Sequence, residues 1–360
     1  MSNATSMEQD RSDLIAMIHD SVEAFVPTGA DLKRIRQLRY AAPGFDRSTW
    51  REICGLGWVG LRVPEAEGGS GLGLREFCVV AEGLGVGLVP EPLIPCGMTA
   101  ELLGGDTLAD VLSGERIIVP AWQERPHSLD VGASTQIHGG RVTGRKVFVP
   151  MAGGADAFLV ATADALALVE RDAPGVTLML DTTQDGGQFG TLALSDAPAQ
   201  PVVASAEAVA AALDHATLAT AAYLLGVTER AFAITLDYLK VRKQFGRLIG
   251  SFQALQHRAV DLRIQISLLR ASVESAAATL DAAPSPALRQ AVVSRAKARA
   301  AEVSMMVNRQ AIQLHGAIAY TDEYDVGLYL RKAMTLANLY GSADVHRARY
   351  ARVSAGLDEA

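Results

Sequence analysis

An apolar seam at spacings of three and four residues is the feature of this sequence that most constrains its fold. The seam consists of Phe252, Leu255, Ala259, Leu262, Ile266, Leu269 and Val273. Residues at these spacings share one face of an α-helix, so the seam predicts one long helix with a continuous buried face. Other helices normally cover a face of this length, which predicts a bundle. A turn at 281–286 and a further helix from 287 to about 314 fit that bundle.

Helical patterns also begin the chain, and a block of short strands lies between. Residues 10–116 carry apolar side chains at helical spacing, which predicts an N-terminal α-helical domain. Residues 117–203 break into short apolar runs separated by Gly, Asp or Pro, and Gly139-Gly140 is suited to a hairpin turn. We expect an antiparallel middle domain, a small barrel or sandwich, followed by a C-terminal helical bundle over 204–357. The expected strands are 117–120, 135–138, 141–143, 147–149, 157–161, 165–170 and 176–181.

Composition excludes several classes of partner. The net charge is −7 without a long basic tract, so we expect neither nucleic acid nor an acidic membrane surface as a partner. Cys54, Cys78 and Cys96 are an odd number without metal-binding spacing, which indicates reduced thiols in a cytoplasm and no metal site. We expect no membrane span, because no apolar run approaches the length of a bilayer. The sequence therefore predicts a soluble cytoplasmic protein with a small-molecule ligand.

A basic, glycine-broken turn, residues 242–253, separates two helical stretches. Arg242 and Lys243 place cationic donors at a helix end, and Gly246 allows the chain to turn. Two interpretations are open on these residues alone. The turn can be an ordinary helix C-terminus, or it can hold an anionic or heteroaromatic cofactor.

Four segments in chain order resemble the acyl-CoA dehydrogenase family along nearly the whole sequence. The resemblance implies an α domain, a β domain and a four-helix bundle, with FAD bound between them and across a subunit interface. It also implies an acyl-CoA thioester as substrate, an electron-transfer flavoprotein as acceptor, and an oligomer, typically a dimer of dimers. The segments are Leu56 to Pro64 with Gly68 to Gly73, Val142 to Val149 with Ala155-Asp156, Arg242-Lys243-Gln244-Phe245-Gly246, and Gln313-Leu314-His315-Gly316.

The resemblance assigns a set of FAD contacts. The guanidinium of Arg242 suits a pyrophosphate and the ring of Phe245 suits an adenine platform. Gln253 and Gln313 can each donate and accept hydrogen bonds, and Gly316 permits close backbone approach. In the family these residues reach the flavin of a neighbouring subunit. The full predicted set is Arg242, Gln244, Phe245, Gln253, Gln313, Gly316, Ala317 and Ser342.

The catalytic base of the family is missing. The reaction removes an α proton from the thioester, which requires a carboxylate. The usual glutamate position falls on Tyr340, and a second position used by some members falls near Ala216. Neither is acidic, although Asp214 is close to the second and is a minority candidate for a displaced base. We interpret Tyr340 as an aromatic packing residue, because an unperturbed phenol is protonated at neutral pH.

The middle-domain flavin segments also depart from the family pattern. Pro150 stands where Ser or Thr usually contacts the flavin, and 122–128 replaces a Thr-Glu-Pro-like segment. The chain thus resembles the base-lacking subunit of bacterial heteromeric members that act on steroid-like or branched acyl-CoA. Two alternatives stay open, a scaffold that binds no flavin productively and a self-sufficient flavoenzyme with a displaced base.

Five residues are expected to have structural roles only. We expect His315 and His346 to be satisfied histidines without a metal. Asp214 and Glu229 are expected to be solvated helix charges, and Trp122 to be either core or pocket lining.

Overall fold

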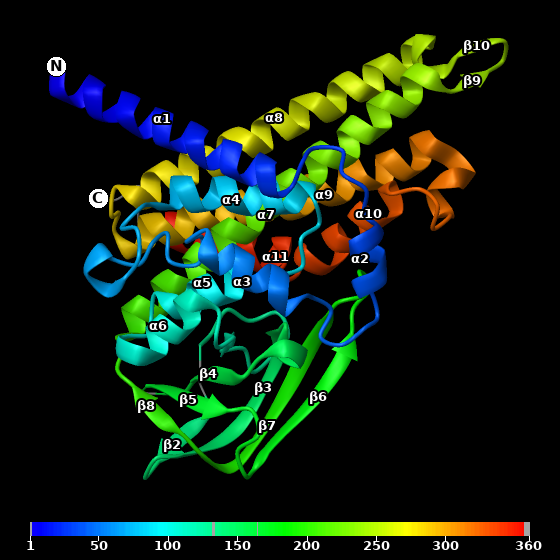
Figure 1. Cartoon of the computed structure of the whole chain (residues 1–360). Helices are drawn as coiled ribbons and strands as arrows, with labels where there is room; N and C mark the ends of the chain where they lie inside the picture. The colour runs from blue at the N-terminus through cyan, green and yellow to red at the C-terminus, as the bar shows by residue number, and fades with distance from the viewer. Residues whose placement is uncertain (1, 132–133, 164, 356–360) are drawn as a thin grey trace.

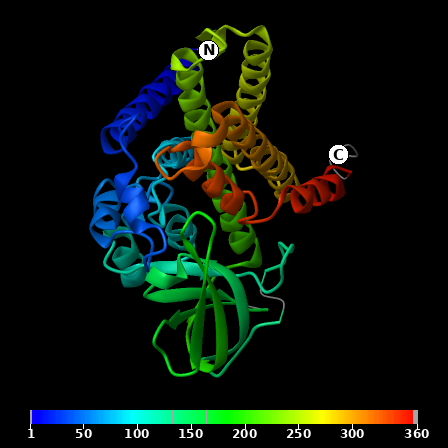
Figure 2. The ribbon, with the colours of Figure 1, turned by 90° about the vertical axis from the view of Figure 1, so that its right-hand side faces the viewer.

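The computed structural model describes residues 2–131, 134–163 and 165–355, and it has helices, then strands, then helices, as expected (Figure 1). Viewed at right angles, the sheets lie at one end and the long helices extend away from them (Figure 2). The division into domains at 116 and 203 remains a prediction. The N-terminal helices are α1 (Ser2–Phe25), α2 (Lys33–Leu38), α3 (Arg47–Gly55), α4 (Leu74–Val86), α5 (Leu93–Ala100) and α6 (Gly105–Ser113).

The middle strands form two four-stranded sheets, ordered β1-β4-β5-β8 and β2-β3-β7-β6. Gly139 and Gly140 turn the β2–β3 hairpin with positive φ angles of 54° and 73°, as predicted. The strands are β1 (Ile118–Ala121), β2 (Gln136–His138), β3 (Arg141–Pro150), β4 (Ala157–Ala161), β5 (Leu166–Glu170), β6 (Val176–Thr182), β7 (Gln188–Pro198) and β8 (Gln200–Val202).

Three expectations for this region need correction. The domain is not wholly antiparallel, because β1 pairs with β4 in parallel. Among the described residues the strands lie in two separate sheets rather than in one closed barrel. The runs at 141–143 and 147–149 belong to the single strand β3. Strands β7 and β8 were not predicted, since β7 has Thr191 as its one β-branched residue and therefore a weak strand signal.

The C-terminal part contains three long helices, α7 (Ala206–Val241), α8 (Gln253–Asp281) and α9 (Pro286–His315), and two shorter ones, α10 (Val326–Leu336) and α11 (Ala343–Ser354), packed on α9. The α8 seam is buried from Leu262 to Val273. It is only half-buried at Phe252, Leu255 and Ala259, because this end of α8 projects beyond the other helices (Figure 1).

Helix α7 corrects one expectation. By length and composition it could cross a bilayer, which no run was expected to do. However, 78% of its most apolar 18-residue window is buried inside the protein. Helix α7 is therefore a core helix of this chain.

Two glycines bring α4 and α7 into backbone contact. A Cβ added at Gly226 would lie 1.9 Å from the carbonyl oxygen of Glu82, and one at Gly85 would lie 2.2 Å from the carbonyl oxygen of Tyr223. Because only glycine allows so close an approach, these positions fix the N-terminal helices against the bundle.

We therefore expect Gly226→Ala to lower the free energy of unfolding by about 1–3 kcal/mol, because the backbone must move to admit the methyl group. Urea denaturation measures this change. The control is Gly55→Ala at the end of α3, where an added Cβ meets no atom within 4 Å and stability should not fall. Equal stability of the two variants would contradict the close crossing of α4 and α7.

Candidate functional site

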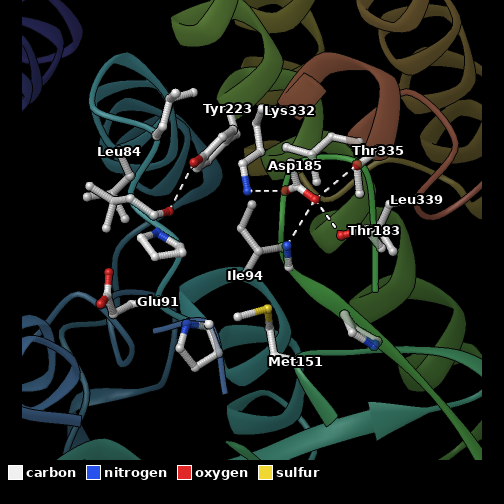
Figure 3. A pocket seen from close by; sticks show the side chains of 18 of the residues that line it. Leu84, Glu91, Ile94, Met151, Thr183, Asp185, Tyr223, Lys332, Thr335 and Leu339 are labelled. Carbon is white, nitrogen blue, oxygen red and sulfur yellow. Dashed lines mark hydrogen bonds and ion pairs between the residues drawn. The ribbon is translucent and has the colours of Figure 1, made fainter. Parts of the chain in front are cut away.

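A largely apolar cavity of about 110 Å³ lies where the N-terminal helices, the middle strands and the C-terminal helices meet (Figure 3). Its walls include Leu84 and Ile94 from the first part, Met151 from the second, and Tyr223 and Leu339 from the third. The Tyr223 hydroxyl donates to the carbonyl oxygen of Val89 at 3.0 Å and so is not free in the cavity.

A polar cluster centred on Asp185 forms one wall of this cavity. Its carboxylate pairs with Lys332 and accepts hydrogen bonds from Thr183 and, at 3.1 Å, from Thr335 (Figure 3). Burial raises the pKa of Asp185, but the Lys332 ammonium and these hydrogen bonds outweigh it and hold the pKa below its ordinary value. Asp185 is thus a paired carboxylate that fastens the β6–β7 turn to α10, and it is not a free base.

Tyr340, at the usual base position, also lines the cavity. The residue is 1% exposed, and its hydroxyl has no hydrogen-bond partner among the described residues. Burial raises the pKa of Tyr340 further above its ordinary value. Its ring stacks on Trp122, with centroids 6.5 Å apart and planes at 18°. Tyr340 is therefore a neutral packing residue, as predicted, and Trp122 is its buried partner.

Two buried residues hold the Tyr340 segment in place: Lys297, which the sequence did not single out, and His346, which was expected only to be a satisfied histidine. Lys297 is fully buried in α9, and its Nζ donates to the carbonyl oxygens of Leu336, Ala337 and Gly341 at 3.2, 2.9 and 2.9 Å. Burial lowers the pKa of Lys297 to about 7. His346 Nε2 donates to the Tyr340 carbonyl oxygen at 2.8 Å. A lysine among alanines within a helix gives no sequence signal for such a role.

His346 should make the protein sensitive to acid. Burial, together with the nearby Lys297 and Arg349, lowers its pKa to about 3, compared with 6.5 for an ordinary histidine. The unfolded chain therefore binds the extra proton first, so stability is complete above pH 6.5 and is lost as the pH falls towards 3. Between pH 7 and 4.5 we expect His346 to account for a loss of about 2–3 kcal/mol.

Denaturant titrations at several pH values measure this loss. His346→Phe should flatten the curve below pH 6.5 relative to wild type, whereas His138→Gln on the exposed strand β2 should not. Identical curves for wild type and His346→Phe would overturn the role of His346.

The second base position is also without a free carboxylate. Ala216 is buried in α7. Asp214 was expected to be a solvated helix charge, and this expectation was wrong. The residue is 1% exposed and paired with Arg289 at 2.9 Å and Arg349 at 2.7 Å. It is absent from the residues that line the Tyr340 cavity. Glu229 is likewise paired, with Arg263 at 3.0 Å. Sequence reasoning missed these pairs because their partners lie on distant segments.

The basic turn forms a hairpin that projects from the bundle (Figure 1). Strand β9 (Lys243–Gln244) pairs with β10 (Arg247–Leu248), and Phe245 and Gly246 make the turn with φ angles of 53° and 76°. Phe245 is 90% exposed at the tip. Arg242 caps the end of α7, and Gln253 begins α8. These predicted FAD contacts therefore lie close together at the surface of the described chain.

The end of α9 lies beside the last turn of α7, which leads into this hairpin. His315 stacks on Tyr238 of α7, with ring centroids 4.5 Å apart, which places Gln313, Gly316 and Ala317 at the same end of the bundle. His315 Nδ1 donates to the Ala311 carbonyl oxygen at 2.7 Å, and burial lowers the pKa of His315. Gln313, Gly316 and Ala317 are exposed. The predicted contacts other than Ser342 thus lie at the same end of the bundle, on the projecting hairpin and on the end of α9, and we call this region the clamp.

Ser342 lies elsewhere. It caps α11 by accepting from the Val345 amide at 3.4 Å, and it lines a separate cavity of about 160 Å³ with Gln123 and Phe148. In the nearby segment 122–128, the carboxylate of Glu124 has a structural role. It accepts hydrogen bonds from the Lys146 ammonium at 2.7 Å and from the amide and hydroxyl of Thr135. Burial raises the pKa of Glu124, but the hydrogen bonds lower it by more, so the pKa lies below its ordinary value.

The clamp and the surroundings of Ser342 differ in the chemical groups that they offer to FAD. The clamp offers a guanidinium, amide groups and an exposed aromatic ring, and a Cβ at Gly316 would meet no atom within 4 Å. This donor set suits one side of a nucleotide site. Ser342 lines the cavity of about 160 Å³ and also a more open one of about 670 Å³ along α9. Pro150, which lines the Tyr340 cavity, has no N–H to donate to a flavin. Among the described residues, the donor set that suits a nucleotide is therefore the one at the clamp.

Two family models match this chain. The model of the acyl-CoA dehydrogenase N-terminal domain matches residues 12–103, and the model of the C-terminal domain matches residues 206–355. The chain belongs to the acyl-CoA dehydrogenase family. It is thus placed among oxidoreductases that act on acyl-CoA, in agreement with the resemblance in its motifs.

Particular acyl-CoA dehydrogenases are similar over nearly the whole chain. IpdE2 of Mycobacterium tuberculosis is 31% identical and covers 91% of this chain and 92% of its own length. FadE27 of the same species is 30% identical, with 94% of each chain covered. Among solved structures, a Tcur3481-Tcur3483 steroid ACAD variant has a TM-score of 0.88, at 29% identity over 97% of this chain and 99% of its own. The ChsE4-ChsE5 complex from Mycobacterium tuberculosis has a TM-score of 0.83, at 27% identity over 96% of each chain.

Proposed function

We propose that this chain is the base-lacking subunit of an FAD-dependent acyl-CoA dehydrogenase, and that a related chain supplies the catalytic carboxylate. The observation that carries the proposal is the contrast between its two sites. The base position holds the buried, neutral Tyr340, while the clamp residues Arg242 and Phe245 face outward on a projecting hairpin. A chain built this way can complete a neighbour's site but has no carboxylate with which to start the reaction in its own.

In this assembly the clamp binds and orients the cofactor. Arg242 would neutralise the pyrophosphate, Phe245 would cover the adenine, and the amides of Gln253 and Gln313 would hold polar edges. When bound, FAD would supply the acceptor for the β hydrogen as hydride, and the partner's carboxylate would take the α proton. An electron-transfer flavoprotein would be the final electron acceptor. The reaction belongs in the cytoplasm.

The substrate is proposed to be a bulky acyl-CoA thioester, of the steroid or branched type. The similar solved structures that are named as a steroid ACAD and as a two-protein complex support both the substrate class and the heteromeric arrangement.

A second candidate function is a scaffold that stabilises a partner and binds no flavin productively. Pro150, which has no N–H to donate to a flavin, favours it. A self-sufficient enzyme with a displaced base is disfavoured, because the carboxylate of Asp214 is already ion-paired with Arg289 and Arg349. Flavin absorbance distinguishes the three. We expect flavin only when the chain is co-purified with a related chain that carries glutamate at the Tyr340 position. Flavin that is bleached by acyl-CoA in the lone chain would overturn the proposal, and a stable pair without flavin would favour the scaffold.

Arg242→Ala should lower the flavin content of the co-purified pair by at least about tenfold, because a charge-assisted hydrogen bond to phosphate is lost. The measurement is the ratio of flavin to protein absorbance after gel filtration. Arg295→Ala is the matched control, since Arg295 is exposed on the opposite half of α9. Equal flavin content in the two variants would remove Arg242 from the clamp.

A further inference from the structure

A small cavity lies beside the buried ion pairs of Asp214 and shares no lining residue with the Tyr340 cavity. Its volume is about 150 Å³, and it lies where the first turns of α7 and α9 meet the second half of α11. We call it the arginine cavity. The proposed function gives it no role. Its polar lining consists of Asp130, Asp214, Gln290, Arg349 and Arg352.

Arg349 is the lining residue that indicates a ligand. Its side chain is 10% exposed, so its guanidinium is almost fully removed from water. Nε donates to the Ser294 hydroxyl at 2.6 Å, and Nη1 pairs with Asp214 at 2.7 Å. Nη2 is buried and has no hydrogen-bond partner among the described residues. A buried N–H without an acceptor is costly, and more so on a charged group, so Nη2 indicates a place for an acceptor from outside the described chain.

The ion pairs around the arginine cavity leave one positive charge in excess. Asp214 is shared by Arg289 and Arg349. Arg289 also pairs with Glu207, so these two acids balance two arginines. Arg352 is an exposed lining residue for which the described part of the chain provides no ion pair. A free guanidinium and an unpartnered N–H in one cavity both favour an anion.

We propose that the arginine cavity binds the phosphate group of a small molecule, held by Arg349, Arg352 and the side-chain amide of Gln290. A guanidinium matches the geometry of phosphate oxygens. Phosphate also has more acceptor oxygens than a carboxylate, so it can serve two guanidinium groups and an amide at once. The remaining lining acid, Asp130, pairs with Arg125 at 3.2 Å and therefore does not cancel the excess charge. This site does not depend on the proposed function.

The test titrates inorganic phosphate into the full chain and follows the phosphorus NMR signal. We expect a dissociation constant of about 1 mM, as two charge-assisted hydrogen bonds at a partly open site would give. Arg352→Gln should weaken binding by about tenfold, because it removes the excess charge without breaking a described ion pair. Arg258→Gln is the matched control and should not change the constant, because Arg258 is exposed near the start of α8, at the hairpin end of the bundle.

A second variant tests the buried guanidinium. Arg349→Gln should weaken phosphate binding by at least about tenfold, since it removes the unpartnered Nη2. It also breaks the pair with Asp214, so circular dichroism must first show that the variant folds. Arg352→Gln decides the question by itself if Arg349→Gln does not fold. Equal constants for wild type, Arg352→Gln and Arg258→Gln would overturn the site. So would an unchanged phosphorus signal at a phosphate concentration about tenfold above the expected constant.

Competition identifies the source of the phosphate. The competitors are coenzyme A and dephospho-coenzyme A, which lacks the phosphate on its ribose. Displacement of inorganic phosphate by coenzyme A alone assigns the cavity to that ribose phosphate, and displacement by both compounds assigns it to their pyrophosphate. Displacement by neither assigns it to free phosphate. Each of these three results supports the site, provided that Arg352→Gln weakens the binding.

Discussion

Replacing Asp214 with alanine is expected to lower the free energy of unfolding by about 3–5 kcal/mol. Asp214 is 1% exposed and bonds both Arg289 and Arg349, so its removal leaves two largely buried guanidinium groups without their common carboxylate. Chemical denaturation measures the change. Glu207→Ala is the matched control, because Glu207 pairs with the same Arg289 but is 55% exposed and should contribute about 1 kcal/mol or less.

The same position decides the question of a displaced base. Asp214→Asn keeps the shape of the side chain but cannot accept a proton. If Asp214 were the base, flavin reduction by acyl-CoA would stop in the asparagine variant. We expect instead that Asp214→Asn destabilises the fold and that any flavin reduction in the co-purified pair continues at the wild-type rate. A stable Asp214→Asn variant with no flavin reduction would contradict the structural role.

Two substitutions of Tyr340 are expected to change the free energy of unfolding in opposite directions. Tyr340→Ala should lower the free energy of unfolding by about 3–5 kcal/mol, because it removes a fully buried ring that stacks on Trp122. Tyr340→Phe should preserve or raise stability, by up to about 1 kcal/mol, because it removes a buried hydroxyl that has no partner. Thermal and urea unfolding of both variants provide the measurements.

A chemical role for Tyr340 would reverse the second result. If its hydroxyl bound a ligand or acted as a base, Tyr340→Phe would reduce the flavin chemistry of the assembly without improving stability. Unchanged flavin reduction in Tyr340→Phe, with unchanged or higher stability, supports the interpretation of a packing residue.

Much of the architecture could be predicted from local patterns. The seam of α8, the turn before Pro286 and the strand β4 were predicted at or close to their observed positions. Helix periodicity and turn residues act within a few positions along the chain, so they are visible in sequence. The parallel pairing of β1 with β4 was not visible, because it joins segments that are 39 residues apart. Strand β7 was missed because its pairing partners, rather than its own propensity, hold it in the sheet.

The candidate site shows the same limit. The motifs at 242–253 and 313–317 predicted which residues belong to the clamp. They did not predict that the two segments lie at the same end of the bundle. Ser342 was grouped with them by motif, and the structure separates it into another cavity. Lys297 and His346 carried no motif, yet they hold the Tyr340 segment.

The sequence by itself determined the order of helices and strands, the membership in a family, and the absence of an acid at Tyr340. Only the tertiary structure decided which acidic side chains are buried in ion pairs and which are available to a ligand. Asp214 and Asp185 are acidic residues in the sequence, but in the folded chain each is buried against a cationic partner from a distant helix. The physical reason is that desolvation and ion pairing depend on what surrounds a side chain in space, whereas periodicity depends only on its neighbours along the chain.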